Sequence, residues 1–306
     1  MLEVEVFTTK IMNNELLDKI TESTLKNKGP LWLENLRINE KDFGFEQTIR
    51  DIIPIKAKSL VLAAGPESKK IFGENFRLIN QKRKELAIVA CDGALKMLAS
   101  NDCIPDYIVS VDGDPIIANF YKNSKELLKG VTVILATTIH PNVVQYCIDG
   151  GANIKWVQPF FKDTPHKEFF RKGIPSIKMG GNVGTASYLL TSLVLKGNPI
   201  GLMGIEFAWS DETPYSQTQY YEKLMEALDQ KSEKVKEQYV HVKNDVDGKT
   251  YIADPVYYAY SLMFKEIWDE ELPSEIKQMT YNLTVGGILS MNDLKSIDVE
   301  KFLEIK

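Results

Sequence analysis

The chain has little cysteine and little histidine, and each shortage excludes a class of protein. Its 306 residues contain three cysteines and three scattered histidines. The cysteines, Cys91, Cys103 and Cys147, form no CxxC pair, and three cannot all pair with one another. These features exclude a disulfide scaffold and a zinc ribbon, and they favour a reducing cytoplasm as the compartment.

An excess of positive charge is also lacking, as is a long uninterrupted apolar stretch. Lysine and arginine number 37 against 42 acidic residues, which gives a formal net charge of -5. Proteins that bind nucleic acid usually have a basic face, so we expect no nucleic-acid partner. The apolar stretch at 185–205 is broken by polar and proline residues at 196–199, which predicts a buried helix and strand and no membrane span. The polar N-terminus predicts no signal peptide.

The chain does contain short apolar runs that alternate with helix-like stretches. The runs occupy residues 59–63, 86–90, 107–111, 131–136, 154–157 and 199–204. Continuous apolar runs of this length are typical of strands buried on both faces. Strands that alternate with helices indicate βαβ units. We therefore predict an α/β fold with a mostly parallel, Rossmann-like, three-layer sheet.

Three segments are expected along the chain. Residues 1–55 are polar and predict an N-terminal helical extension, and residues 56–210 predict the α/β nucleotide-binding core. Residues 211–306 predict a lid helix, a hairpin and a C-terminal helix and strand that cap the core. Asp247-Gly248 marks the hairpin turn, and Asp254 is expected to be the N-cap of the next helix. Whether residues 211–237 form a surface helix or a mobile lid stays open.

Polar or glycine-rich turns follow the apolar runs. Carboxyl ends of parallel strands share one edge, where open α/β sheets bind ligands, so we expect these turns to converge. The candidate site residues, in chain order, are Gly65, Pro66, Asp92, Gly93, Asp112, Asp114, His140, Gly180, Gly181, Asn182 and Glu206.

Asp112-Gly113-Asp114 is the sharpest of these motifs. Two carboxylates separated by one glycine can both reach one divalent cation, and Mg²⁺ prefers one or two carboxylates with waters and substrate phosphates. The alternative is an Asx-turn in which both acids are solvated. His140 is the best candidate among the histidines for a general acid or base. Asp92 serves by default as an N-cap, with a ligand hydroxyl or a metal as the alternative.

The glycine turns have two interpretations each. Gly65 allows backbone amides to approach an anion, or it simply makes a tight turn. Gly180-Gly181-Asn182 either caps the following helix or leaves amides for a phosphate. Two adjacent glycines exceed what a cap needs, which favours the ligand interpretation there.

In their order along the chain, these motifs resemble a known family. The matching segments are residues 62–66 (Leu-Ala-Ala-Gly-Pro), 92–94 (Asp-Gly-Ala), 104–114, 180–186, 199–207 and 282–287. They are similar to the domain of archaeal 6-hydroxymethyl-7,8-dihydropterin diphosphokinases, which also occurs in motility accessory factor proteins. A more distant likeness is to thiamin diphosphokinases. The resemblance covers about residues 55–290.

The resemblance implies a nucleotide-utilising transferase. Asp112 and Asp114 match the acidic motif expected to hold Mg²⁺, and Gly65 matches the glycine of the first turn. The implied reaction is transfer of diphosphate from the co-substrate ATP to 6-hydroxymethyl-7,8-dihydropterin or a similar hydroxymethyl acceptor. The expected partners are the nucleotide and the small-molecule acceptor, with no nucleic acid and no membrane, and a homo-oligomer is left open.

Two alternatives to the diphosphokinase stay open. The segment after the fourth run contains only His140, where diphosphokinases of this kind are rich in histidine. The later glycine segment, the Asp247-Gly248 hairpin, Asp254 and the Asn-Leu-Thr ending at 282–284 are also more similar to the motility accessory factor version. Both departures favour a glycosyltransferase of that type, which would use a nucleotide-activated nonulosonic sugar. A non-catalytic nucleotide sensor is the third hypothesis.

Overall fold

Two units make up the chain, and each is described by itself. The computed structural model describes residues 2–160 and 164–305. The unit that we call the sheet unit consists of Gly29–Ile205, Pro273–Thr284 and Asp293–Lys306. The unit that we call the hairpin unit consists of Met1–Lys28, Glu206–Leu272 and Val285–Asn292. This grouping is spatial, and the division of the chain at residues 55 and 210 stays a prediction.

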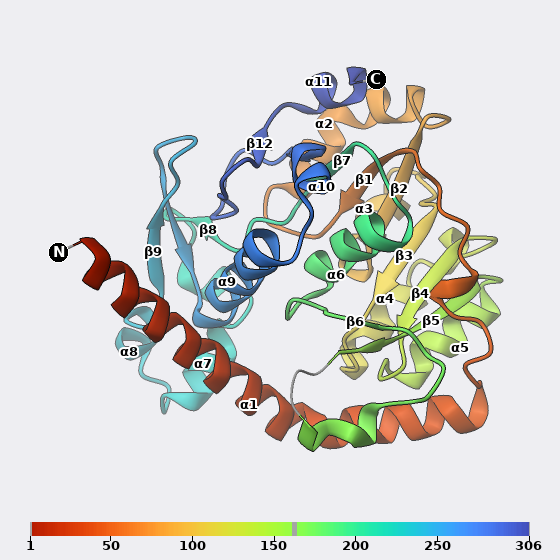
Figure 1. Ribbon diagram of the computed structural model, residues 1–306, viewed down its shortest axis with the longest axis horizontal. Coiled ribbons are helices and arrows are strands. Elements are labelled where there is room, and N and C mark those ends of the chain that lie inside the picture. The colour runs from red at the N-terminus through yellow and green to blue at the C-terminus, as the bar shows by residue number, and fades with distance from the viewer. Residues whose placement is uncertain (1, 161–163, 306) are drawn as a thin grey trace. The chain divides into compact units, whose positions relative to one another are not determined.

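The sheet unit is built on nine strands, and every pair of neighbouring strands is parallel. Figure 1 shows β1 to β5 side by side. The order is β12-β11-β7-β1-β2-β3-β4-β5-β6. The strands are β1 (Lys58–Leu62), β2 (Leu86–Cys91), β3 (Tyr107–Ser110), β4 (Thr132–Ala136), β5 (Asn153–Pro159), β6 (Ser176–Ile177), β7 (Ile200–Met203), β11 (Thr280–Asn282) and β12 (Lys295–Ser296).

Helices cover both faces of this sheet. Leu60, Leu62 and Ile88 lie on the face that packs against one group of helices in a shared apolar core. That group comprises α2 (Ser68–Gln81), α3 (Leu95–Ala99), α4 (Ala118–Lys122), α5 (Pro141–Asp149) and α11 (Val299–Glu304). On the other face α6 (Val183–Leu189) contacts β1, β2 and β3 and continues into a π-helix (Leu190–Val194). The predicted three-layer α/β fold is thereby confirmed.

Short elements complete the sheet unit. They are α10 (Ser274–Gln278) and the 3-10 helices η1 (Ile49–Asp51), η2 (Asp92–Ala94), η3 (Pro115–Ile117), η4 (Lys125–Leu127) and η5 (Thr164–Phe169). All three cysteines are buried and free.

The hairpin unit contains a three-stranded antiparallel sheet in the order β8-β10-β9. Its strands are β8 (Trp209–Ser210), β9 (Val240–Lys243) and β10 (Thr250–Ala253), and its helices are η7 (Tyr215–Gln217), α7 (Tyr221–Ala227), α8 (Ser232–Lys236) and α9 (Pro255–Glu270). Asp254 caps α9, because its Oδ1 accepts hydrogen bonds from the backbone N of Val256 and Tyr257, both at 2.9 Å. The predicted hairpin and the predicted helix start are confirmed.

Helix α1 (Leu2–Asp42) forms the predicted N-terminal helical extension. From Gly29 onward it belongs to the sheet unit, and there its buried side chains include two asparagines, Asn35 and Asn39, beside Leu36. Among the described residues, no helix combines the length and the apolar character needed to cross a membrane.

Candidate functional site

The turns that follow β1, β2, β3, β4 and β7 all lie at the carboxyl edge of the parallel sheet. The strand order reverses between β1 and β7, which is where open α/β sheets bind ligands. At that point the backbone N of Gly65 donates to the carbonyl of Gly204 at 3.0 Å. The loop after β3 lies two strand spacings from the β1 turn, about 10 Å. The structure thus brings the predicted turns of the sheet unit to one edge.

The acidic loop after β3 contains Asp112 and Asp114, both partly buried. Oδ1 of Asp112 accepts a hydrogen bond from the backbone N of Asp114 at 3.1 Å. Oδ1 of Asp114 accepts one from the backbone N of Ile116 at 3.1 Å and so caps η3. Both acids therefore make the Asx-type turn that the sequence offered as one interpretation. Each of these bonds uses one carboxylate oxygen, so the turn and a metal role are compatible.

Gly113, between the two acids, is packed against two other segments. A Cβ added there would lie 2.5 Å from the carbonyl oxygen of Thr138, 2.6 Å from Cδ1 of Trp32 and 2.8 Å from Nδ2 of Asn35. The acidic loop, the turn after β4 and helix α1 thus meet at one backbone position that only glycine fits.

His140 is the N-cap of α5. Its Nδ1 accepts a hydrogen bond from the backbone N of Asn142 at 3.2 Å, so the neutral ring carries its proton on Nε2. Partial burial lowers the pKa of His140, while the negative charge of Asp114 acts in the opposite direction. The ring is therefore held as a neutral hydrogen-bond donor at Nε2. In this tautomer Nε2 can donate a hydrogen bond to an anionic oxygen, and the acid–base role expected from the sequence stays a prediction.

Asp92, at the end of β2, is only 4% exposed. Its Oδ2 accepts from Oγ of Ser110 at 2.6 Å, and its Oδ1 accepts from the backbone N of Gly93 at 2.7 Å. Burial raises the pKa of Asp92 to about 6; the two hydrogen bonds lower it, and the charge of Asp112 raises it further. Asp92 thus joins the ends of β2 and β3. Gly93 lets this turn approach β1, since a Cβ would stand 3.0 Å from Cβ of Ala64.

The turn after β1 is a tight turn into α2. The carbonyl of Gly65 accepts hydrogen bonds from the backbone N of Ser68 at 3.1 Å and from its Oγ at 2.7 Å. The amide of Gly65 is itself engaged by Gly204, and Pro66 has no N–H to offer. The structure therefore favours the plain-turn interpretation of Gly65 over direct anion binding by its own amide.

The Gly180-Gly181-Asn182 turn precedes α6. Oδ1 of Asn182 accepts from the backbone N of Thr185 at 2.9 Å, which makes Asn182 the N-cap. Gly180 and Gly181 have φ angles of 59° and 79°, a left-handed conformation that favours glycine. The sequence interpretation held that two glycines exceed what a cap requires. The backbone conformation of the turn accounts for both glycines, because both have a positive φ.

The start of α6 lies near the β1 turn. A Cβ added at Gly184 would be 3.7 Å from Cβ of Ala63. The chain thus returns from β6 to the strand-order reversal, and it brings Asn182 toward the turn that contains Gly65.

Glu206 follows β7 and belongs to the hairpin unit. Its side chain is buried, and its carbonyl accepts a hydrogen bond from the backbone N of Ile288 at 2.8 Å. Gly287, with a φ of 73°, lies against the backbone of Glu206. The ligand-binding role of Glu206 stays a prediction.

Comparison with known protein families identifies the family to which the chain belongs. The family described as 6-hydroxymethylpterin diphosphokinase MptE-like matches residues 32–212. The chain belongs to this MptE-like family. The matched region contains the turns from Gly65 to Asn182, and it begins inside α1, ten residues before that helix ends.

A solved structure shares the fold of this MptE-like chain. The MAf glycosyltransferase from Magnetospirillum magneticum AMB-1 superposes with a TM-score of 0.57 at 13% sequence identity. The alignment covers 83% of this chain and 35% of the glycosyltransferase, so the chain spans about a third of the length of that protein. No curated protein matches the sequence.

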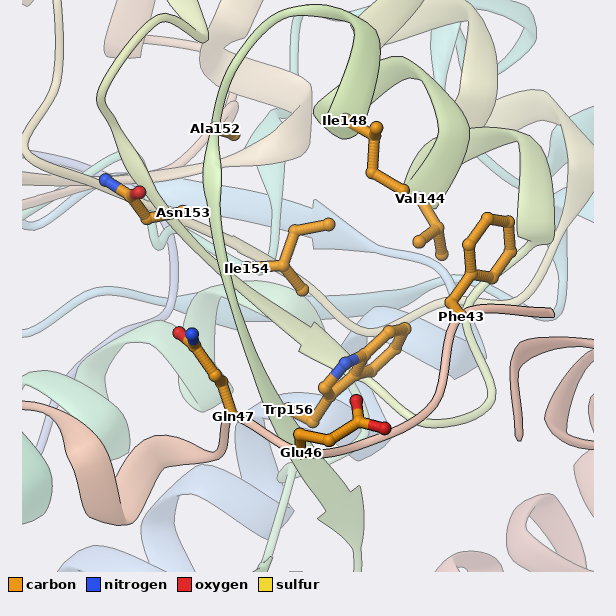
Figure 2. A pocket seen from close by; sticks show the side chains of 9 residues that line it. All are labelled: Phe43, Glu46, Gln47, Val144, Ile148, Ala152, Asn153, Ile154 and Trp156. Carbon is orange, nitrogen blue, oxygen red and sulfur yellow. The ribbon is translucent and has the colours of Figure 1, made fainter. Parts of the chain in front are cut away.

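Two cavities of the MptE-like domain lie away from the strand-end turns. One, whose lining side chains are shown in Figure 2, lies between α5, β5 and the segment after α1, and its volume is about 270 Å³. It is lined by Phe43, Glu46, Gln47, Val144, Ile148, Ala152, Asn153, Ile154 and Trp156. The other, of about 500 Å³, lies at the amino ends of β2, β3 and β4. None of the candidate residues lines either cavity.

Sequence reasoning missed three contributors to this edge. Asn35 and Asn39 hold the loops after β3 and β4, and Ser110 holds Asp92. A signal for the asparagines was present, since both lie on the same helix face as the predicted apolar anchors Trp32 and Leu36. Buried polar residues on an apolar face require partners, which is a cue to look for loops nearby.

Proposed function

We propose that the chain is a magnesium-dependent diphosphokinase that transfers diphosphate from ATP to 6-hydroxymethyl-7,8-dihydropterin or a similar hydroxymethyl acceptor. The observation that carries the proposal is the pairing of two loops at the carboxyl edge, one with Asp112 and Asp114 and the other with His140. The interaction of His140 with the charge of Asp114 supports their action at one ligand. Membership of the MptE-like family supports the reaction type.

The donor set of the acidic loop fits a hard divalent cation. Asp112 and Asp114 supply two carboxylates from one turn. Among the described residues, no group of three or more His, Cys, Asp or Glu side chains forms a ready-made metal cage. Mg²⁺ usually takes one or two carboxylates together with waters and substrate phosphates, so this pair suits a cation that arrives with a nucleotide. When bound, Mg²⁺ neutralises charge on the phosphates and on the leaving group.

The proposed transfer is a single displacement at phosphorus. The hydroxyl oxygen of the acceptor attacks the β-phosphorus of ATP and forms a new O–P bond. The bond from that phosphorus to the oxygen shared with the α-phosphate breaks, and AMP leaves with the electron pair. The hydroxyl proton is released to solvent. Nε2–H of His140 donates to a phosphate oxygen, and the loops contribute by positioning, which is worth several kcal/mol in such reactions.

The test is the formation of AMP from ATP, 6-hydroxymethyl-7,8-dihydropterin and Mg²⁺. The variant Asp112→Asn/Asp114→Asn keeps an Oδ1 acceptor at each position, so the turn is expected to persist while the charge is lost. We expect AMP formation to fall at least about 100-fold, because charge stabilisation of this kind is worth roughly 10²–10³ in rate.

The matched control is Asp102→Asn, which removes an exposed carboxylate before β3, at the other end of that strand. It is expected to retain the full rate. Wild-type activity in the Asp112→Asn/Asp114→Asn variant would end the metal proposal.

The second candidate function is glycosyl transfer from a nucleotide-activated acidic sugar. The single histidine of the loop after β4 favours it, as does the fold shared with a protein described as a glycosyltransferase. In this case the Asn182 turn would bind the nucleotide or the sugar carboxylate, and no metal is required. Thermal-shift measurements separate the two functions. Stabilisation by CMP or a CMP-linked sugar, with none from ATP and Mg²⁺, would favour glycosyl transfer.

A further inference from the structure

Helix α1 reaches the carboxyl edge through two buried amide side chains. Nδ2 of Asn35 donates to the carbonyl of Gly113 at 2.9 Å and to the carbonyl of Thr138 at 3.1 Å. These carbonyls belong to the loops after β3 and β4. A single amide group therefore bridges the acidic loop and the loop that leads into His140.

Asn39 lies one helical turn further along α1 and contacts the second loop alone. Its Nδ2 donates to the carbonyl of Thr137 at 3.0 Å and to the carbonyl of Ile139 at 2.8 Å. Ile139 directly precedes His140. The two asparagines together supply four hydrogen bonds, one to the backbone between Asp112 and Asp114 and three to the backbone that precedes His140.

These bonds are made out of contact with water. Asn35 is 2% exposed and Asn39 is 0% exposed. Buried backbone carbonyls need hydrogen-bond donors. A loop beyond the end of a strand receives none from a neighbouring strand, so its donors must come from elsewhere. The positions of the two loops are therefore set by α1 as well as by the sheet.

Two acceptors in this cluster, Oδ1 of Asn39 and Oγ1 of Thr137, are buried without a hydrogen-bond partner among the described residues. An unsatisfied buried polar atom costs about 1–3 kcal/mol, so packing alone would favour an apolar residue at the position of Asn39. Only the Nδ2 donor of Asn39 makes hydrogen bonds. This indicates that an amide is kept at this position for its bonds to the carbonyls of Thr137 and Ile139.

We propose that Asn35 and Asn39 are positioning residues of the active site: Asn35 holds the acidic loop and the histidine loop in fixed register, and Asn39 fixes the histidine loop alone. Helix α1 then contributes to the active site by positioning its loops. The catalytic consequence rests on the proposed function, whereas the positioning itself does not.

The test compares amide hydrogen exchange in the variants Asn35→Ala and Asn39→Ala with that of the wild type. Asn35→Ala is expected to accelerate exchange at least about tenfold in residues 111–117 and in residues 137–142, because local opening becomes easier in both loops. Asn39→Ala is expected to accelerate exchange in residues 137–142 only.

The matched control is Asn244→Ala in the hairpin unit. Asn244 is also buried and donates to a distant backbone carbonyl, that of Gly287 at 2.9 Å. It is expected to leave exchange in both loops unchanged. If Asn35→Ala does not fold, Asn35→Leu fills the space without a donor and gives the same test. Unchanged exchange in both loops, or identical patterns in Asn35→Ala and Asn39→Ala, would overturn the proposal.

Measurements of kcat and KM test the catalytic consequence separately from the positioning. In Asn35→Ala we expect the kcat for AMP formation to fall about 100-fold, since misplacement by about 1 Å has effects of this size, with the KM for ATP within threefold. Loss of stability alone would lower the active fraction and would be matched by Asn244→Ala. A kcat equal to that of the wild type in the folded Asn35→Ala variant would overturn the catalytic role. If the wild-type protein forms no AMP, the proposed function fails and hydrogen exchange still decides the positioning.

Discussion

At the scale of single residues, hydrogen bonds decide what the candidate groups can do. Asp92 and His140 both follow strands, at the carboxyl edge that the sequence predicts for them. Their chemistry depends on their hydrogen-bond partners, one within the same turn and one from the next strand. His140 is restricted to donation at Nε2 by the backbone of Asn142, and Asp92 is occupied by Ser110. The sequence gives no direct sign of either partner.

The N-cap role of His140 can be separated from its role toward a ligand. His140→Asn keeps a good N-cap but removes the ring N–H, so we expect kcat for AMP formation to fall roughly 10²-fold with little change in Tm. His140→Ala removes the cap as well and is expected to lose about 1 kcal/mol of stability. Parallel kinetics and thermal unfolding of both variants measure this. A wild-type kcat in His140→Asn would remove His140 from the site.

Asp254 predicts an unusual pH dependence of stability. Burial raises the pKa of Asp254 from 3.8 to about 6, although two backbone N–H groups act to lower it. Its Oδ2 is buried and has no hydrogen-bond partner among the described residues. Because the folded protein binds this proton more tightly than the unfolded chain, the contribution to stability is full below pH 4. It is lost as the pH rises from 4 to 6.

The variant Asp254→Asn isolates this contribution, since asparagine also caps helices well. Relative to the wild type, the variant is expected to gain up to about 3 kcal/mol between pH 4 and pH 7, from two pKa units at 1.36 kcal/mol each. Urea unfolding at several pH values measures the difference. A difference that does not change with pH would show that Asp254 titrates normally.

At the scale of elements, the strands were predictable and the contacts between loops were not. Runs such as residues 59–63 and 86–90 match β1 (Lys58–Leu62) and β2 (Leu86–Cys91) to within one residue. Buried parallel strands are continuous apolar runs, so the pattern is strong. Strand β12, at the edge of the sheet, and its neighbour β11 have two and three residues, which is too short for a pattern to show.

The sequence of α1 indicates that its buried asparagines need partners, but it does not identify those partners. Asn35 and Thr138 are separated by 103 positions, and no local pattern reports a contact over that distance. The polar composition of residues 1–55 predicted an extension packed on the core. The structure shows that the part from Gly29 onward contacts the loops that carry the proposed chemistry.

The close approach at Gly113 gives a test of the junction between α1 and the two loops. Gly113→Ala places a Cβ against Thr138, Trp32 and Asn35, so we expect a loss of about 1–3 kcal/mol from overpacking. Gly73→Ala in the middle of α2 is the control. Nothing lies within 4 Å of its Cβ position, and the change is expected to stabilise by about 0.5–1 kcal/mol. Equal stability of Gly113→Ala and the wild type would show that the surrounding groups can shift at little cost in free energy.

At the scale of the whole molecule, the family and the fold are established, and the chemistry of the bound ligand separates the candidate reactions. Parallel βαβ order and convergent strand-end turns followed from the apolar pattern, and the MptE-like match agrees with the motif order. The identity of the acceptor depends on side chains that touch it, and the pattern of apolar runs carries no information about those contacts. Ligand experiments therefore decide between diphosphate transfer and glycosyl transfer.

The most direct measurement is a crystal structure grown with Mg²⁺ and an ATP analogue that has a methylene group between the α- and β-phosphorus atoms, so that the bond cannot be cleaved. The account predicts phosphates between the acidic loop and His140, with the cation on Asp112 and Asp114. A nucleotide bound instead at the amino ends of β2, β3 and β4, or bound without a cation at the two aspartates, would contradict it.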